Sequence, residues 1–260
     1  MTRPDWIDSM HAMEIIAHRG ASHEAPENTP GAFKLAWEQG ADAAECDVHL
    51  SRDGQVMVIH DATTGRTTGR RGVVAGRTAA GLARLDAGSW KARRWRGECI
   101  PTLAQVLDTV PAGKRLFIEI KSGPETVAPL VPVVRHSPLG TRGAVIIGFD
   151  LRVMALAKRT MPRVPVYWGL ESIPAGVGRR AWPLTTKEII RLARAARLDG
   201  VDVDSRGPID GRFVRELRGA GLEVFVWTVN SARVARRLAR AGVAGITTDR
   251  PGWLRKALRD

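Results

Sequence analysis

Short apolar runs alternate with helical segments along almost the whole chain. The runs have the length and composition of strands buried in a parallel sheet. The predicted strands are Glu14–Ala17, Ala43–His49, Leu116–Lys121, Ala144–Phe149, Pro165–Gly169, Gly200–Asp204, Glu223–Thr228 and Gly245–Thr248. The predicted helices are Pro30–Gln39, Thr102–Thr109, Glu125–His136, Leu151–Met161, Thr186–Arg197, Gly211–Ala220, Ser231–Ala241 and Pro251–Leu258.

Eight strand–helix units in 260 residues favour an α/β fold, the TIM (β/α)8 barrel, which typically needs about 250 residues. An open doubly wound sheet is the alternative, but no glycine-rich dinucleotide fingerprint follows the first strand. One segment interrupts the alternation, because Val56–His60 forms an extra strand close behind the second one. The Gly-, Arg- and Thr-rich stretch that follows, about residues 62–100, is predicted to be an insertion over the barrel mouth. We expect a single domain spanning residues 1–260.

The composition excludes several classes of protein. No apolar stretch approaches the roughly 18–20 residues of a membrane span, and the segment Met1–Trp6 lacks the apolar region of a secretory signal. The two cysteines, Cys46 and Cys99, do not suggest a disulfide framework. We therefore expect a cytoplasmic protein without stable membrane insertion, and the oligomeric state stays open.

The chain is strongly basic, with a formal net charge of +13. Many arginines recur at helical spacing opposite apolar positions, as Arg191, Arg194 and Arg197 do, which is typical of the solvated face of an amphipathic helix. A nucleic-acid partner is not expected, since such a partner would favour charge gathered in one stripe. A positive field would still attract an anionic small-molecule substrate.

Polar residues gather where the predicted strands end. They occur in the groups His18-Arg19-Gly20, Glu45-Cys46-Asp47, His60-Asp61 and Glu119-Ile120-Lys121. The carboxyl ends of parallel strands meet at one edge of the sheet, where ligands bind, so these side chains are expected to converge. Two histidines, three carboxylates, an arginine and a lysine in one place indicate catalysis rather than packing.

The carboxylates predict a metal site. Glu45 and Asp47 are two residues apart on a strand and point to the same face, and Glu119 comes from the next barrel strand. Converging carboxylates repel one another unless a cation lies among them, and oxygen ligands select Mg²⁺, Ca²⁺ or Mn²⁺ over zinc. The alternative is that Glu45 and Asp47 are structural and pair with arginines. Cys46, between them, should point away into the layer between barrel and helices.

The other strand-end residues suit phosphoryl chemistry. His18 and His60 at one rim fit a general acid and a general base, although a lone histidine is more often structural. Arg19 and Lys121 can donate hydrogen bonds to an anionic group, most naturally a phosphate. Enolisation at an acidic metal site is the alternative chemistry.

Two aromatic residues also end predicted strands. Phe149 follows the fourth strand and Trp227 ends the seventh. Each side chain either forms a wall of the pocket or packs in the core, and the sequence does not decide between these two positions.

A series of short motifs occurs in order between about Ile15 and Pro251. These motifs are Ile16-Ala17-His18-Arg19-Gly20, Pro26-Glu27-Asn28-Thr29, Glu45-Cys46-Asp47-Val48, Val58-Ile59-His60-Asp61, Leu85-Asp86-Ala87-Gly88-Ser89-Trp90, Ile100-Pro101-Thr102-Leu103, Ile118-Glu119-Ile120-Lys121, Val226-Trp227-Thr228-Val229-Asn230 and Gly245-Ile246-Thr247-Thr248-Asp249-Arg250-Pro251. In this order and spacing, the sequence resembles the glycerophosphodiester phosphodiesterases.

The resemblance implies a TIM barrel with a small insertion after the second strand. It also implies hydrolysis of glycerophosphodiesters to sn-glycerol 3-phosphate and an alcohol, with one divalent ion, Mg²⁺ or Ca²⁺. A glycerol hydroxyl can act as the nucleophile in such enzymes and give a cyclic phosphate that water then opens. By motif match, the implied roles are acid–base catalysis for His18 and His60, metal binding for Glu45, Asp47 and Glu119, phosphate binding for Arg19 and Lys121, and loop support or glycerol contact for Glu27.

Two segments depart from the family pattern. Gly148-Phe149-Asp150 stands where Ser-Phe-Asp or Ser-Phe-Asn is common, and Tyr167-Trp168-Gly169 is bulkier than expected, which would reshape the alcohol site. Two other functions stay open. One is a lysophospholipase D-type activity at the same site, for which the insertion offers few bulky apolar residues. The other is a non-catalytic barrel that binds polyanions through its basic surface.

Overall fold

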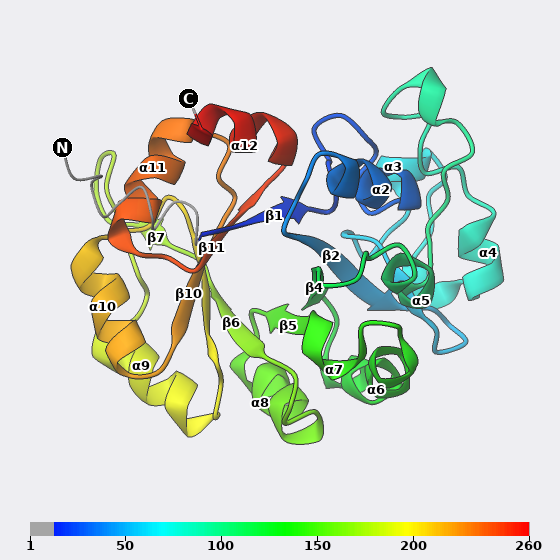
Figure 1. The fold of residues 1–260 in the computed structure, drawn as a ribbon. Helices are drawn as coiled ribbons and strands as arrows, with labels where there is room; N and C mark the ends of the chain where they lie inside the picture. The colour runs from blue at the N-terminus through cyan, green and yellow to red at the C-terminus, as the bar shows by residue number, and fades with distance from the viewer. Residues whose placement is uncertain (1–12, 260) are drawn as a thin grey trace.

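Eight parallel strands form a closed ring in the computed structural model, which describes residues 13–259. The ring strands are β1 (Glu14–His18), β2 (Ala43–Leu50), β4 (Arg115–Ile120), β5 (Ala144–Gly148), β6 (Val166–Leu170), β9 (Gly200–Asp204), β10 (Glu223–Trp227) and β11 (Gly245–Thr248). Strand β1 pairs with both β11 and β2, which closes the ring (Figure 1). The predicted TIM barrel is confirmed, while the assignment of residues 1–260 to one domain stays a prediction.

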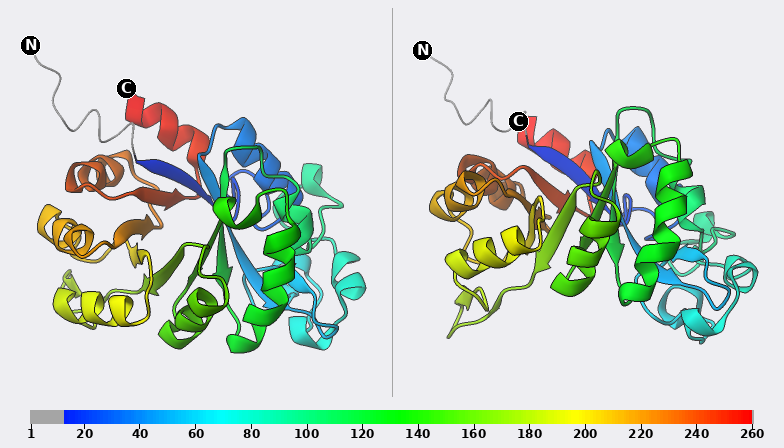
Figure 2. Two further views of the ribbon diagram at one scale, coloured as in Figure 1. Left: turned by 60° about the horizontal axis from the view of Figure 1, so that its bottom comes forward. Right: turned by 90° about the horizontal axis from the view of Figure 1, so that it is seen from below.

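A helix on the outside of the ring follows each of these strands, as both views in Figure 2 show. Thr29, Thr102 and Thr185 begin three of these helices, and each side chain accepts a hydrogen bond from a backbone N–H of the first turn. The outer helices are α2 (Pro30–Glu38), α5 (Leu103–Leu107), α6 (Val127–His136), α8 (Leu151–Thr160), α9 (Thr186–Ala195), α10 (Gly211–Gly219), α11 (Ala232–Ala241) and α12 (Pro251–Arg259).

The inside of the barrel has its own small core, separate from the large core between strands and helices. Phe117, Tyr167 and Phe225 pack together in it, with ring centroids 5.2 Å apart for Phe117 and Phe225 and 4.9 Å apart for Tyr167 and Phe225. The Tyr167 hydroxyl donates to Glu223, the first residue of β10. Tyr167 therefore points toward the amino ends of the strands, and for this residue the expectation that it reshapes a site at their carboxyl ends is wrong. For Trp168 and Gly169 that expectation stays a prediction.

The extra strand β3 (Val56–Val58) lies outside the ring and pairs antiparallel with β2. The insertion after it builds a second small core around Leu82, which is fully buried. Its short helices are α3 (Gly65–Thr68), η1 (Val74–Gly76), α4 (Ala79–Ala83) and η2 (Arg93–Trp95).

The insertion packs beside the barrel mouth. Lys91 donates to the backbone carbonyl of Ser22, and Arg94 and Trp95 donate to that of Glu24, so the insertion is fastened to the loop between β1 and α2. None of residues 62–99 lines the pocket at the mouth. The prediction that this segment lies over the mouth is therefore corrected. The insertion lies to one side of the mouth, where the β1–α2 loop holds it (Figure 1).

The remaining described elements are short. They are η3 (Pro124–Thr126), α7 (Gly140–Gly143) and the hairpin of β7 (Ile173–Pro174) and β8 (Arg180–Ala181). Among residues 13–259, no helix combines the length and the apolar character that crossing a bilayer requires. The expectation about a secretory signal concerns residues 1–6, which lie outside the described residues, and the cytoplasmic location stays a prediction.

Candidate active site

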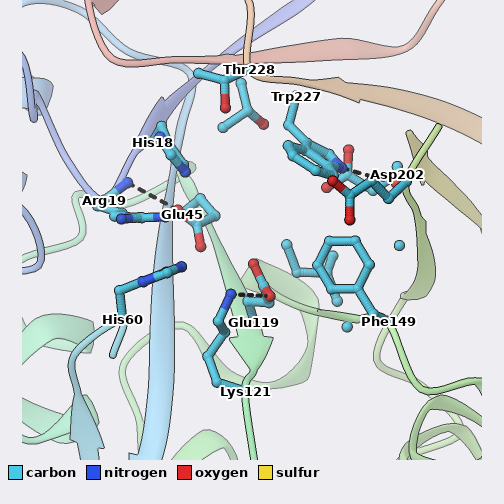
Figure 3. A pocket seen from close by; sticks show the side chains of 15 residues that line it. His18, Arg19, Glu45, His60, Glu119, Lys121, Phe149, Asp202, Trp227 and Thr228 are labelled. Atoms are coloured by element: carbon cyan, nitrogen blue, oxygen red, sulfur yellow. Dashed lines mark hydrogen bonds and ion pairs between the residues drawn. The ribbon is translucent and has the colours of Figure 1, made fainter. Parts of the chain in front are cut away.

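The carboxyl ends of the ring strands surround a pocket of about 320 Å³. Most of the predicted site residues line this pocket, and Figure 3 shows how they face one another. They are His18, Arg19, Glu45, His60, Glu119, Lys121, Phe149 and Trp227. Asp47 is fully buried beside Glu45 on β2, and Glu27 lies outside the set of lining residues. The eight lining residues come from four ring strands and from the loops that follow β1, β3, β4 and β5.

Three carboxylates form a cluster that fits a metal ion. One oxygen each of Glu45, Asp47 and Glu119 lies within 4.8 Å of the others, because β2 and β4 pair in a register that sets Asp47 opposite Glu119. Oε1 of Glu45 and Oδ1 of Asp47 are buried and accept no hydrogen bond from any residue that the structure describes. Burial raises the pKa of Glu45 well above its ordinary value, and the charges of Asp47 and Glu119 raise it further. Unpartnered acidic oxygens in this arrangement suit a hard divalent cation.

Asp47 differs from the two glutamates because basic groups surround it. Its Oδ2 accepts a hydrogen bond from Asn28 Nδ2 (2.8 Å) and lies 3.1 Å from Arg19 Nε, while its Oδ1 lies 3.6 Å from Lys121 Nζ. Burial alone would raise the pKa of Asp47, but Arg19 and Lys121 lower it overall. Asp47 is thus ionised, whereas burial favours the protonated form of Glu45 until a cation binds. Cys46 packs in the outer core, as predicted.

Arg19 is held by an unusual backbone conformation as well as by ion pairs. Its φ of 55° lies in the left-handed region, which costs a non-glycine residue about 1–3 kcal/mol. In this conformation its backbone N–H donates to Glu45 Oε2 (2.9 Å), and its side chain donates to Glu27 Oε1 (3.0 Å). The next residue, Gly20, packs so closely that a Cβ there would lie 2.6 Å from the Ala32 carbonyl carbon. The turn thus fixes the guanidinium at the edge of the carboxylate cluster.

Each of the two histidines is paired with a carboxylate. His18 Nδ1 lies 2.6 Å from Asp249 Oδ1, and His60 Nδ1 lies 2.7 Å from Asp61 Oδ1. Although burial would raise the pKa of Asp249, the bonds from His18 and its neighbours lower it to about 2, and the bond from Arg66 lowers the pKa of Asp61. Ionised carboxylates accept only, so both Nδ1 atoms donate. Each neutral ring then has a free Nε2, and Figure 3 shows both rings pointing into the pocket.

The carboxylate partners are themselves anchored. Asp249 accepts from Asn230 Nδ2 (2.6 Å). Arg66, in the insertion, donates to both oxygens of Asp61 and to both oxygens of Glu27. Glu27 therefore joins Arg66 to Arg19 and supports the loop, which is one of its two expected roles. A contact between Glu27 and the glycerol stays a prediction.

Phe149 and Trp227 form an aromatic wall of the pocket. Their ring centroids lie 5.6 Å apart with the planes at 87°. The Trp227 indole nitrogen donates to the backbone carbonyl of Asp202 (3.2 Å) on the neighbouring strand β9. The sequence leaves open whether these side chains form a wall of the pocket or pack in the core. In the structure both lie in the pocket wall.

Comparisons with known proteins agree with this geometry. A model of the glycerophosphoryl diester phosphodiesterase family matches residues 18–253. The chain belongs to this family. A relative from Caldanaerobacter subterraneus, named glycerophosphodiester phosphodiesterase, is 33% identical over 256 residues, which cover 94% of this chain and 97% of the relative. Another of that name, from Bacillus subtilis, is 31% identical and covers 93% of this chain and 85% of the relative.

Solved structures of the phosphodiesterase family share the fold. A phosphodiesterase from Oleispira antarctica, in complex with the product sn-glycerol-3-phosphate, superposes with a TM-score of 0.83 at 28% identity and covers 96% of this chain and 98% of its own. A glycerophosphodiester phosphodiesterase from Agrobacterium tumefaciens gives a TM-score of 0.76 at 28% identity, with 93% and 98% covered. The similarity therefore extends over the whole barrel.

Sequence reasoning assigned no role to several residues that build this phosphodiesterase-family site. Asp61 and Asp249 pair with the lining histidines. Asn28 donates to Asp47, Asn230 donates to Asp249, and Arg66 donates to Asp61 and Glu27, which lie behind the lining residues. Asp61 and Asp249 occur inside motifs that carry the resemblance, so their motif positions were a usable signal. Arg66 lies in the insertion, where no periodicity marks it.

Asp249→Asn is expected to lower kcat by about 10- to 100-fold with little change in KM, because the amide no longer fixes the His18 tautomer as an ionised carboxylate does. Steady-state kinetics on a glycerophosphodiester measures this loss. The exposed Asp108, at the end of α5, gives the matched control Asp108→Asn, for which wild-type kinetics are expected. An unchanged kcat in Asp249→Asn would show that the His18–Asp249 contact has no part in turnover.

Proposed function

We propose that this protein is a metal-dependent glycerophosphodiester phosphodiesterase, which hydrolyses its substrate to sn-glycerol 3-phosphate and an alcohol. The observation that carries the proposal is one pocket holding a three-carboxylate cluster, two carboxylate-paired histidines and the cations Arg19 and Lys121. The names of the relatives and the product complex of the Oleispira antarctica enzyme support the same reaction.

Glu45, Asp47 and Glu119 would hold one divalent ion, Mg²⁺ or Ca²⁺. When bound, such an ion neutralises charge on the phosphate and polarises a phosphoryl oxygen. Arg19 and Lys121 would bind the phosphate oxygens from the other side. Burial would lower the pKa of Lys121, but Glu119 and Asp47 raise it overall, so its ammonium stays charged and available as a donor.

The two histidines would move the protons. The free Nε2 of one ring would take the proton from the attacking hydroxyl, which belongs either to water or to the glycerol itself. The other ring, protonated, would give its Nε2 proton to the alkoxide oxygen of the leaving alcohol. Burial lowers the pKa of His60, so its ring is neutral at pH 7 and able to accept a proton.

The aromatic wall would bind the carbon skeleton of the substrate. Phe149 and Trp227 present apolar surfaces on the side of the pocket away from the histidines (Figure 3). Such surfaces exclude water from the reacting phosphate, which strengthens the electrostatic interactions around it. The proposed substrate is therefore a small diester that fits between the charged and the aromatic sides.

The test is release of glycerol 3-phosphate from a panel of glycerophosphodiesters after EDTA treatment, and again with Mg²⁺ or Ca²⁺ restored. The expected result is activity that EDTA abolishes and one of the two ions restores. A lysophospholipid in the panel tests the lysophospholipase D-type alternative. Failure to release glycerol 3-phosphate with any metal would refute the proposal, and turnover of the lysophospholipid alone would favour that alternative.

A further inference from the structure

Asp202, on β9, is a buried acidic residue for which the mechanism above has no use. Its side chain points inward from the barrel wall and lines the pocket, yet it is only 4% exposed. Oδ1 is buried and accepts no hydrogen bond. Within residues 13–259, no cation or hydrogen-bond donor pairs with this carboxyl group.

An unpartnered buried carboxyl group is destabilising, so its presence needs an explanation. Other acids around the pocket have hydrogen-bond partners that explain them, since Asp61 and Asp249 bond to the two histidines and Glu27 bonds to two arginines. Asp202 lies outside the metal cluster of Glu45, Asp47 and Glu119. Burial, followed by the charge of Glu119, raises the pKa of Asp202 well above its ordinary value. The partner of the Asp202 carboxyl group is therefore expected to belong to the molecule that binds in the pocket.

The surroundings of Asp202 indicate what that partner is. In the sheet register Asp202 lies beside Gly169 of β6, which has no side chain to cover it. The Phe149 ring occupies the space in front of Gly169, and Trp227 is bonded to the Asp202 backbone. Figure 3 shows these three side chains on the side of the pocket opposite His18, Arg19 and His60. A group reaching this side meets the two aromatic rings and the carboxyl group of Asp202.

A short polyol chain has matching chemistry, because its carbons can pack on the rings while one hydroxyl bonds to the carboxyl group. We propose that Asp202 binds a hydroxyl group of the substrate's glycerol moiety and so selects glycerol phosphodiesters over diesters that lack this hydroxyl. This inference rests on the proposed function. It makes Asp202 a specificity residue, distinct from the residues that bind the metal and the phosphate.

The test compares binding of two probes to the metal-loaded protein by calorimetry, inorganic phosphate and sn-glycerol 3-phosphate. Asp202→Leu keeps the number and branching of the side-chain heavy atoms but is larger and cannot accept a hydrogen bond, while Asp202→Asn keeps both the size and an acceptor. We expect Asp202→Leu to weaken glycerol 3-phosphate binding by about 10- to 100-fold, the range for a hydrogen bond that involves an ionisable group. Its phosphate affinity should stay within about twofold of wild type, and Asp202→Asn should lose less than Asp202→Leu.

Kinetics give a second readout. For Asp202→Leu, kcat/KM should fall for glycerophosphocholine but not for bis(p-nitrophenyl) phosphate, a diester with no glycerol. Thermal unfolding checks folding, and a stable variant is expected because an unpaired buried acid is removed. Asp202→Leu could instead lose equal affinity for phosphate and for sn-glycerol 3-phosphate, or lose affinity for neither. Either result would overturn the assignment of Asp202.

The binding data also separate this inference from the proposed function. A wild-type protein that binds glycerol 3-phosphate through Asp202 but hydrolyses no glycerophosphodiester would refute only the proposed function. A wild-type enzyme that is active on glycerophosphodiesters but binds glycerol 3-phosphate equally well without Asp202 would refute only the role of Asp202.

Discussion

His18→Ala and His60→Ala are each expected to lower kcat for a glycerophosphodiester by about 10²- to 10⁴-fold, the usual contribution of a positioned acid or base. Each ring has its Nδ1 bonded to a carboxylate, which leaves its Nε2 to exchange a proton with the substrate. Both rings are partly exposed at the pocket, and their removal leaves no cavity in the core. The free energy of unfolding should therefore change little.

Steady-state kinetics and thermal unfolding together test this prediction. His136→Ala is the matched control, because His136 is exposed at the end of α6. Metal affinity, measured by calorimetry, should be retained in both active-site variants, since neither histidine belongs to the carboxylate cluster. If either variant keeps more than a tenth of the wild-type kcat, that histidine is not the acid or the base.

Glu45→Gln is expected to reduce metal-dependent activity by about 10³-fold or more and yet to stabilise the metal-free protein. The loss follows from removing one of three ligands whose charge attracts the ion. The stabilisation, about 1–3 kcal/mol, follows from removing a buried carboxylate that is close to Asp47 and Glu119 and has an unpartnered oxygen. The side-chain oxygen of the glutamine can still accept the hydrogen bond from the Arg19 backbone N–H.

The stability difference should depend on pH in a defined direction. The pKa of Glu45 is raised in the folded protein, so its contribution to stability is fully present below its unfolded-state pKa and is lost as pH rises through the folded-state value. In EDTA, the advantage of Glu45→Gln should thus grow as the pH rises above the ordinary pKa of a glutamate. Asp47→Asn should instead destabilise the protein, because Arg19 and Lys121 lower the pKa of Asp47.

Thermal unfolding of wild type, Glu45→Gln and Asp47→Asn at several pH values, with and without metal, measures these effects. Added Mg²⁺ or Ca²⁺ should raise the melting temperature of wild type and have little effect on Glu45→Gln. A lower melting temperature of Glu45→Gln in EDTA would mean that the cluster needs no cation to be stable.

The barrel and most of the pocket could be predicted from the sequence because both depend on local patterns. Buried parallel strands appear as short apolar runs, and a polar residue that ends such a run is carried to the barrel mouth. His18 and Glu119 were found in this way. The position of an inward-pointing strand residue along the barrel axis is less accessible, since it depends on the register with neighbouring strands. For this reason the sequence places Tyr167, with Trp168 and Gly169, near the alcohol site and gives Asp202 no role, whereas Tyr167 lies in the inner core near the amino ends of the strands.

Pairings across long sequence separations could not be predicted. Asp249 reaches His18 because β11 and β1 close the ring, which no local pattern encodes. Arg66 lies in a segment whose short helices follow no clear period, so its position between Glu27 and Asp61 depends on how the insertion packs. The insertion was predicted to cover the mouth, but its contacts with the β1–α2 loop hold it to the side.

The bond between His18 and Asp249 ties catalysis to the closure of the barrel ring. Asp249 is synthesised 231 residues after His18, so a nascent chain has the three carboxylates of the cluster long before it has an oriented histidine. Contacts of such separation form slowly and late, because the closure of a long loop has to precede them. Hydrolytic activity should therefore appear only after the last strand has docked, and its recovery during refolding would report the moment when the ring closes.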